Sequence, residues 1–158
     1  MSERSAQHDT FVIERTFDAT PARVFKAFAD PVAKARWFSA TNNEWTEELR
    51  EFDFRVGGRD KLRGKWKSGA VSEFFCTYYD IVPDQRIVYL YEMNVGPKGP
   101  GPKISISLAT IELKAQGERK THMKLTEQGV FLDGFDDGGG RERGTNELMN
   151  KLAESLRS

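Results

Sequence analysis

The sequence has very little cysteine and histidine. Cys76 is the only cysteine among the 158 residues, and the two histidines are His8 and His122. One cysteine cannot build an internal disulfide framework or a cysteine-based zinc cluster. Neither histidine has a cysteine, aspartate or glutamate at the spacing of a metal-binding motif. The sequence therefore predicts no metal site, and no motif in it points to a cofactor.

An excess of charge and long apolar runs are also absent. Lys and Arg together number 24, as do Asp and Glu, so the formal net charge is +0. Such a chain has no overall field that would attract nucleic acid or an anionic membrane. It contains no apolar run of about 18 residues, and its first ten residues, MSERSAQHDT, lack the apolar core of a signal peptide. We therefore expect a cytoplasmic protein without nucleic-acid binding or membrane insertion.

The hydrophobic content is sufficient for one folded core. Hydrophobic residues make up 38% and aromatic residues 11% of the chain. A chain of this length can bury a sizeable core as one domain, whereas two domains would each be marginal. We predict a single ligand-binding domain over residues 11–158, and a disordered tail over residues 1–10.

The first structured segment predicts a strand followed by two short helices. Apolar residues alternate with others from Phe11 to Phe17, which is the period of a strand. Thr20-Pro21 and Asp30-Pro31 each place a good N-cap residue before a proline at the first helical position. The second proline ends one short helix and begins another, which delivers Trp37-Phe38 at its end. This pattern is typical of a bent lid.

The middle of the chain predicts a run of strands. Turn compositions such as VGG, SGA, PDQ and GPKGPGP separate them, so a sequential antiparallel meander is the simplest topology. The expected strands are approximately Leu49–Arg55, Arg59–Lys67, Val71–Val82, Arg86–Val95, Lys103–Lys114 and Thr121–Gln128.

Two of these strands carry finer predictions. In EFDFRVGGRDKLRGKWK, a three-residue loop from Val56 to Gly58 would oppose Phe52 with Leu62 and sort apolar from charged residues. A two-residue loop would mix them. In KISISLATIEL the parity of the apolar residues changes near Ala109, which predicts a β-bulge there.

The last segment predicts a long helix. GGGRERGTNELMNKLAESLRS places Thr145, Met149, Leu152 and Leu156 on one helical face from about Gly140 onward. At 1.5 Å per residue, a helix of about 18 residues spans roughly 27 Å. It is long enough to lie across a whole curved sheet.

Several stretches resemble a known family. They are IERTFDATPARVFKAFADPVAKARWF, DFRVGG, PDQRIVY, TIEL…THMKLTEQG and RGTNELMNKLAESL, in this order, and the resemblance covers about Phe11 to Leu156. Together they resemble the bacterial stand-alone domains of the activator-of-heat-shock-protein-ATPase (Aha-type) homologue family, in the START-like (SRPBCC) superfamily. The resemblance implies an α+β helix-grip fold, in which a curved antiparallel sheet of about seven strands wraps around a long C-terminal helix and two short helices follow the first strand.

The resemblance also implies a cavity between the sheet and the long helix, closed at one end by the two short helices. Many family members carry Gly-Trp where this chain has Gly144-Thr145, and loss of the indole would enlarge or polarise the pocket. An ordinary filled core is the alternative interpretation. By alternation, the residues expected to line the cavity are Trp37, Phe38, Phe52, Phe54, Tyr89, Tyr91, Met123, Thr145, Met149 and Leu152, with Ile87, Met93 and Leu125 beside them.

The leading functional hypothesis is non-catalytic binding of a small hydrophobic or aromatic ligand, without cofactor and with no catalytic residue assigned. One alternative is a cyclase- or dehydratase-like enzyme acting on a hydrophobic ring-bearing substrate. Glu127 and Arg15 are its candidate residues, and ion pairs at the surface or rim are the simpler interpretation of both. An acid with a shifted pKa facing a cation would favour the enzyme, and a wholly apolar wall would not.

A third hypothesis is an interaction module, for example one that stimulates a chaperone ATPase. Its candidate surface is a basic row at strand spacing, which could also be a solvated sheet face. The row consists of Arg59, Lys61, Arg63, Lys65 and Lys67. The sequence also permits a homodimer without requiring one.

Overall fold

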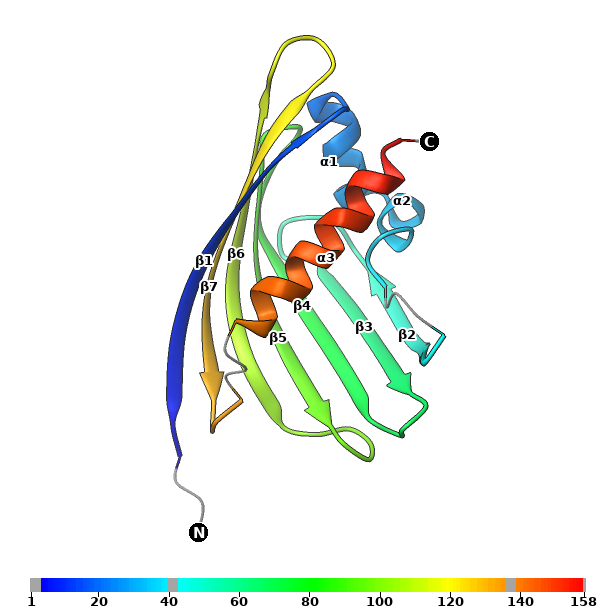
Figure 1. Cartoon of the computed structure of the whole chain (residues 1–158), viewed down its shortest axis with the longest axis vertical. Helices are drawn as coiled ribbons and strands as arrows, with labels where there is room; N and C mark the ends of the chain where they lie inside the picture. The colour runs from blue at the N-terminus through cyan, green and yellow to red at the C-terminus, as the bar shows by residue number, and fades with distance from the viewer. Residues whose placement is uncertain (1–3, 40–42, 136–138, 158) are drawn as a thin grey trace.

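The computed structural model describes residues 4–39, 43–135 and 139–157. Its core is a seven-stranded antiparallel sheet in the order β1-β7-β6-β5-β4-β3-β2, curved around a long C-terminal helix (Figure 1). The elements are β1 (Ala6–Phe17), α1 (Pro21–Ala29), α2 (Pro31–Ala35), β2 (Trp45–Phe52), β3 (Arg59–Trp66), β4 (Val71–Val82), β5 (Arg86–Gly96), β6 (Lys103–Ala115), β7 (Thr121–Leu132) and α3 (Gly140–Ser155). The predicted helix-grip fold and meander are confirmed. Within the described ranges, no helix is both long and apolar enough to cross a membrane.

The first strand is longer than its sequence pattern predicted. It begins at Ala6 and not at Phe11, and residues 6–10 pair with β7 from Ala6 opposite Leu132 onward. This part of the predicted disordered tail is therefore a strand, while residues 1–3 lie outside the described residues. Its residues are mostly exposed, so they carry no apolar alternation and are held by backbone pairing.

The register predicted for β2 and β3 is wrong. Phe52 lies opposite Asp60, and Glu51 lies opposite Lys61. The loop between β2 and β3 is longer than three residues because hydrogen bonds to β4 hold it in place. The prediction compared only the residues of β2 and β3 and did not include β4. The Gly57 backbone N–H donates to the Tyr78 carbonyl at 2.8 Å, and the Tyr78 N–H donates to the Gly58 carbonyl at 3.1 Å.

The bulge predicted near Ala109 is also wrong. β6 pairs without a shift through this position on both sides, and burial alternates regularly along its length. Ser105 and Ser107 are buried on the inner face, in line with Ala109, Ile111 and Leu113. The change in apolar parity therefore marks a polar region inside the fold and not a bend in the strand.

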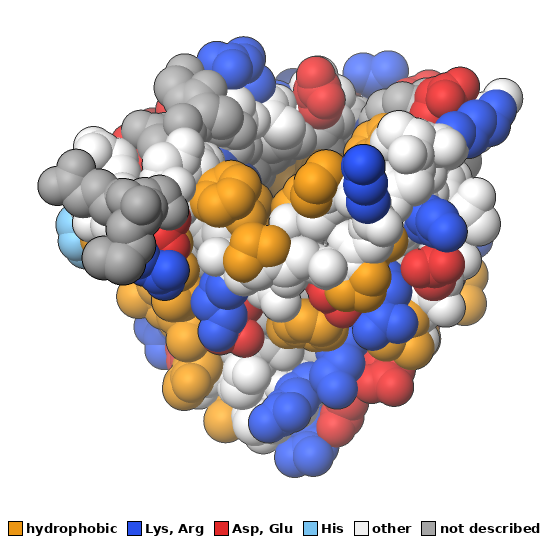
Figure 2. Space-filling model, turned by 90° about the horizontal axis from the view of Figure 1, so that it is seen from below, with side chains coloured by type: hydrophobic (Ala, Val, Ile, Leu, Met, Phe, Trp, Pro, Cys, Tyr) orange, Lys and Arg blue, Asp and Glu red, His pale blue; other side chains and the backbone are white. Residues whose placement is uncertain are grey.

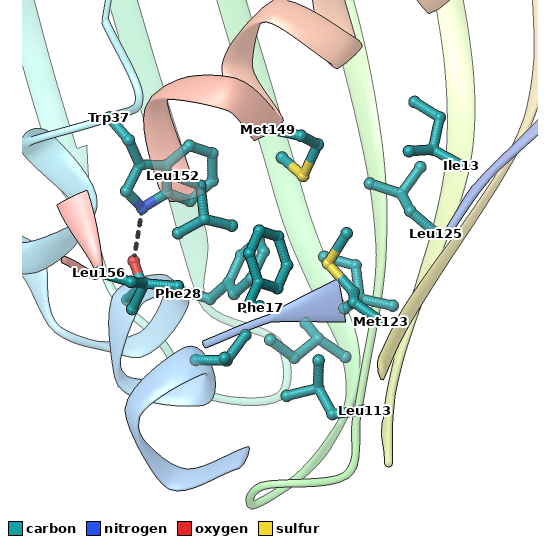
Figure 3. Close-up of a cluster of buried hydrophobic side chains, with 14 of the residues drawn as sticks. Ile13, Phe17, Phe28, Trp37, Leu113, Met123, Leu125, Met149, Leu152 and Leu156 are labelled. Carbon is teal, nitrogen blue, oxygen red and sulfur yellow. Dashed lines mark hydrogen bonds between the residues drawn. The ribbon is translucent and has the colours of Figure 1, made fainter. Parts of the chain in front are cut away.

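The lid forms as its capping residues predict. The Thr20 hydroxyl accepts a hydrogen bond from the Arg23 N–H at 3.3 Å, and the Asp30 carboxylate accepts one from the Ala33 N–H at 2.9 Å. Each cap precedes a proline at the start of its helix. Beyond α2, the Trp37 indole N–H donates to the Ala27 carbonyl at 2.9 Å, which ties the end of the lid back to α1 (Figure 3).

Helix α3 crosses the concave face of the sheet (Figure 1). The C-terminal half of its apolar face packs into the main core, where Met149, Leu152 and Leu156 lie near side chains of β1, α1, β6 and β7 (Figure 3). Two arginines fix this half in place. Arg15 donates to the side chains of Asn150 and Asn146 at 2.8 and 3.0 Å, and Arg23 donates to the Leu156 carbonyl at 2.8 Å.

A buried ion pair joins the lid to the sheet. The Lys34 ammonium of α2 contacts the Asp60 carboxylate of β3, and these side chains are only 10% and 2% exposed. The Tyr78 hydroxyl completes the cluster at 3.1 Å from both Lys34 Nζ and Asp60 Oδ2. Lys34 Nζ also lies over the rings of Phe38 and Phe52, at 4.8 and 5.1 Å from their centroids. Removing one member of such a cluster leaves the other buried without its partner.

We expect Asp60→Ala to lower the free energy of unfolding by about 3 kcal/mol, because it leaves the Lys34 charge buried and unpaired. Chemical denaturation of the purified protein measures this difference. The matched control is Asp53→Ala, which breaks the Asp53–Arg55 pair whose side chains are 53% and 67% exposed; its cost should stay below about 1 kcal/mol. Equal costs for both variants would contradict a structural role for the buried pair.

Candidate ligand-binding cavity

A cavity of about 460 Å³ lies between the inner face of the sheet, the lid and the first half of α3. This volume is within the range of small-molecule sites, roughly 300–1,000 Å³. Its wall includes Phe28, Lys34, Trp37, Phe38 and Ser39 from the lid segment, Trp45, Phe54, Leu62, Trp66, Ser72, Phe74, Tyr78, Ile87, Tyr89, Tyr91, Met93, Leu125 and Glu127 from the sheet and its loops, and Gly140, Arg141, Gly144, Thr145, Glu147, Leu148 and Met149 from α3.

The structure brings most of the sequence-predicted residues to this wall. Those on it are Trp37, Phe38, Phe54, Tyr89, Tyr91, Thr145 and Met149, together with Ile87, Met93 and Leu125. Phe52, Met123 and Leu152 are not among the lining residues. Met123 and Leu152 are fully buried in the packed core, and Phe52 stacks on Phe54 at a centroid distance of 5.9 Å. Alternation identifies the inner face of a strand, but it does not say how far along that face the cavity extends.

Aromatic rings form a continuous row along the cavity wall. Phe38 packs edge-on against Phe74 at 4.9 Å, and Phe74 lies 5.0 Å from Tyr91. The row continues from Tyr91 to Tyr89 at 6.1 Å and from Tyr89 to Tyr78 at 6.0 Å. These centroid distances are typical of favourable ring pairs, so the wall is a preformed apolar surface with hydroxyl groups along it.

Two tryptophans line the cavity from β2 and β3. Trp66 is 36% exposed, and Trp45 is half-buried. The Trp45 indole lies directly on Gly64, where an added Cβ would come within 1.8 Å of Trp45 Cε2. Seen from below, the molecule has hydrophobic side chains near the centre of the face and charges of both signs around them (Figure 2). This face therefore favours no ligand of one particular charge.

A polar region occupies the wall near the start of α3. The Arg141 guanidinium donates to the Tyr91 hydroxyl at 3.0 Å, to the Ser105 hydroxyl at 2.8 Å and to the Ser107 hydroxyl at 3.5 Å. It also lies 5.0 Å from the centroid of the Phe131 ring. Arg141 thus attaches the first turn of α3 to strands β5 and β6, where the serines complete its hydrogen bonds.

Glu127 of β7 is the buried acid of this polar region. It is 3% exposed, and its Oε2 atom has no hydrogen-bond partner among the residues that the structure describes. Burial raises the pKa of this carboxyl, while a hydrogen bond with Tyr91 and the charge of Arg141 act in the opposite direction. Glu127 therefore lies in the cavity wall and not in a surface ion pair. Arg15, the other residue singled out from the sequence, holds α3 to β1.

A second polar cluster, Lys34–Asp60–Tyr78, lies beneath the lid. Burial and the charge of Asp60 raise the pKa of the Tyr78 hydroxyl well above its usual value. Burial raises the pKa of the neighbouring Cys76 thiol to about 12, so this cysteine is protonated at neutral pH and is a poor nucleophile. Lys34 lines the cavity, but its ammonium is already compensated by Asp60.

Sequence reasoning missed Lys34, Asp60, Arg141 and the two serines. The signal for the serines was present, because Ser105 and Ser107 share the parity of Ile111 and Leu113. The others had no local signal, since Lys34 and Asp60 meet across 26 positions and Arg141 and Ser105 across 36.

The remaining candidate groups lie outside the cavity. His122 contacts the exposed Glu14 at 3.0 Å on the sheet surface. Three members of the basic row are paired with acids: Lys61 with Glu51 at 3.7 Å, Arg63 with Glu73 at 3.1 Å and Lys67 with Glu44 at 3.7 Å. Across the described residues, no three His, Cys, Asp or Glu side chains come together in a way that could hold a metal ion.

Comparison with known proteins places this architecture. A protein from Rhizobium leguminosarum is 41% identical, with 99% of each chain covered and a TM-score of 0.89. A protein from Rhizobium loti is 43% identical over 96% of this chain and 99% of its own, with a TM-score of 0.85. An AHSA1-like protein from Aeromonas hydrophila shares the fold at 17% identity, with 94% and 92% coverage and a TM-score of 0.67. No curated protein matches the chain.

The family model also agrees with the motifs found in the sequence. The model described as "Activator of Hsp90 ATPase homolog 1-like protein" matches residues 18–157, which include the lid, six of the seven strands and α3. The chain therefore belongs to this Aha-type family of the START-like superfamily.

Proposed function

We propose that this protein binds a small hydrophobic or aromatic molecule in the cavity between the sheet and α3. The observation that carries the proposal is the cavity of about 460 Å³ with a continuous row of aromatic rings. Burial of roughly 300 Å² of apolar ligand surface contributes about 7 kcal/mol before the costs of association. Those costs take up several kcal/mol, which leaves an affinity nearer the millimolar range, since a millimolar dissociation constant corresponds to about 4 kcal/mol. The buried, protonated Cys76 is consistent with a cytoplasmic location.

Thr145 supports the proposal because of the space that it leaves. It lies on α3 facing the cavity, and its hydroxyl donates to the Arg141 carbonyl one turn earlier at 2.8 Å. A larger aromatic side chain at this position would occupy the volume that a ligand needs. The small residue thus keeps the cavity under the first half of α3 open.

A proton-transfer enzyme acting on a ring-bearing substrate is the second candidate. The specific observation in its favour is Glu127, a cavity acid with a raised pKa near the Arg141 cation. Extraction of any co-purified molecule, followed by its incubation in excess with the protein, tests this candidate. Chemical change by the native protein but not by Glu127→Gln would favour the enzyme, and recovery of unchanged molecule would favour binding alone.

We expect Thr145→Trp to weaken binding of 2-methoxynaphthalene, an uncharged aromatic probe, by at least about tenfold, because the indole fills the cavity. Equilibrium dialysis over a range of protein concentrations measures the dissociation constant. Native mass spectrometry of the same preparations should also show less co-purified small molecule in the variant.

The matched control is Glu154→Trp, which adds the same side chain at an exposed position of the same helix. It should bind the probe as the native protein does. The proposal fails if the native protein binds no probe at millimolar concentration, or if both tryptophan variants bind it equally well.

A further inference from the structure

The most unusual atom in the cavity wall is Glu127 Oε2. It belongs to a side chain that is 3% exposed, and no described residue provides it with a hydrogen bond. The nearby donors are directed elsewhere, since Arg141 donates to Tyr91, Ser105 and Ser107. A buried polar atom without a partner costs roughly 1–3 kcal/mol, so its persistence at this position requires an explanation.

A purely structural role does not account for this acid. Glu127 follows Met123 and Leu125 on the inner face of β7, where both neighbours are buried apolar residues. An apolar side chain would continue that face without the cost of desolvating a carboxyl. Tyr91 and Arg141 do not account for the second oxygen of this carboxyl, which has no partner among the described residues although the residue lines the cavity.

We propose that Glu127 forms a subsite that accepts a hydrogen bond from a hydroxyl group on an otherwise apolar, uncharged ligand. This inference rests on the proposed function, because it names the class of molecule that the cavity selects. The ligand class is a phenol or an alcohol with an apolar ring body. Its ring would lie against the aromatic row, and its hydroxyl hydrogen would reach Glu127 Oε2.

A hydroxyl donor fits the carboxyl in either protonation state. The ionised carboxylate accepts through both oxygens, and the neutral acid retains acceptor capacity while it donates through one oxygen. A ligand whose only polar group is a carbonyl or an ether would place an acceptor against an acceptor whenever Glu127 is ionised. A hydrogen-bond donor is therefore accepted in both protonation states, whereas a ligand with acceptors alone is accepted only by the neutral acid.

The charges around the cavity favour an uncharged ligand. The Lys34 cation is paired with Asp60 beneath the lid, and the Arg141 cation lies in the same hydrogen-bonded group as Tyr91. An anionic ligand near the subsite would meet the carboxyl of Glu127, and a cationic ligand would meet Arg141. Neither charge would be compensated without disrupting contacts that already exist.

The first experiment compares two probes that differ by one hydrogen-bond donor. The probes are 2-naphthol and its methyl ether, 2-methoxynaphthalene, measured by equilibrium dialysis at pH 7 against the full-length protein. We expect 2-naphthol to bind about tenfold more tightly, the discrimination expected when a buried acceptor gains or lacks its donor. Equal affinities would overturn the subsite while leaving the proposed function intact, and binding of neither probe would overturn both.

The second experiment assigns the preference to Glu127. In Glu127→Leu the ratio of the two dissociation constants should fall to about one, because the acceptor is gone. Gln128→Leu is the matched control, since Gln128 is the adjacent residue on the exposed face of β7, and it should keep the tenfold ratio. A preference that survives in Glu127→Leu would overturn the assignment. If that variant does not fold, Glu127→Ala and the native protein supply the same comparison.

The desolvation of Glu127 has a separate signature in the pH dependence of stability. The folded pKa is raised, so unfolded chains ionise first as the pH rises above about 4.3, and the native protein loses stability through this window. Glu127→Gln has no such proton to lose. The titratable or charged groups that face or influence this carboxyl are Asp9 from β1, Tyr89 and Tyr91 from β5, and Arg141 and Glu147 from α3.

We therefore expect the free energy of unfolding of Glu127→Gln, measured in urea without ligand, to rise relative to the native protein as the pH increases above about 4.5. A growing difference supports a desolvated acid in the cavity wall. A difference that is the same at every pH would show that folding does not raise the pKa of this carboxyl, and this would contradict the uncompensated oxygen on which the subsite depends.

Discussion

The structure depends on a mismatch of widths between one helix and one sheet. Seven strands spaced about 4.8 Å apart form a surface roughly 29 Å wide, whereas a helix with its side chains is about 10 Å across. Helix α3 cannot fill the concave face of such a sheet alone. Its second half is completed by α1, β1 and their apolar side chains, which form the packed core. Its first half has no equivalent neighbour, and the cavity occupies that position.

The polar groups inside the fold follow from the same mismatch. Around the cavity, the helices and the sheet are too far apart for close packing, and long side chains make the contacts between them. Lys34 reaches from α2 to Asp60 on β3, and Arg141 reaches from α3 to Ser105 on β6. Both cations have their partners on strands, so polar contacts hold α2 and α3 to the sheet beside the cavity. Glu127 differs from both groups, because only one of its oxygens has a partner within the described chain.

Local signals in the sequence were sufficient to predict most helices and strands, but they were insufficient to predict the polar contacts of the cavity. The starts of α1 and α2 followed from Thr20 and Asp30 because a cap acts within three residues. Strands β3 to β7 followed from turn composition for the same reason. The register of β2 and β3 depended on hydrogen bonds to Tyr78 in another strand. The serines of β6 were misinterpreted because their partner, Arg141, comes from the far end of the chain.

The pairing of β1 with β7 has a consequence for synthesis of the protein on the ribosome. β1 is an edge strand whose partner in the sheet is β7, so residues 6–17 pair with residues 121–132. β1 therefore cannot form this pairing until β7, which comes much later in the sequence, has left the ribosome. A nascent chain of this kind folds late and presents an open strand edge in the meantime.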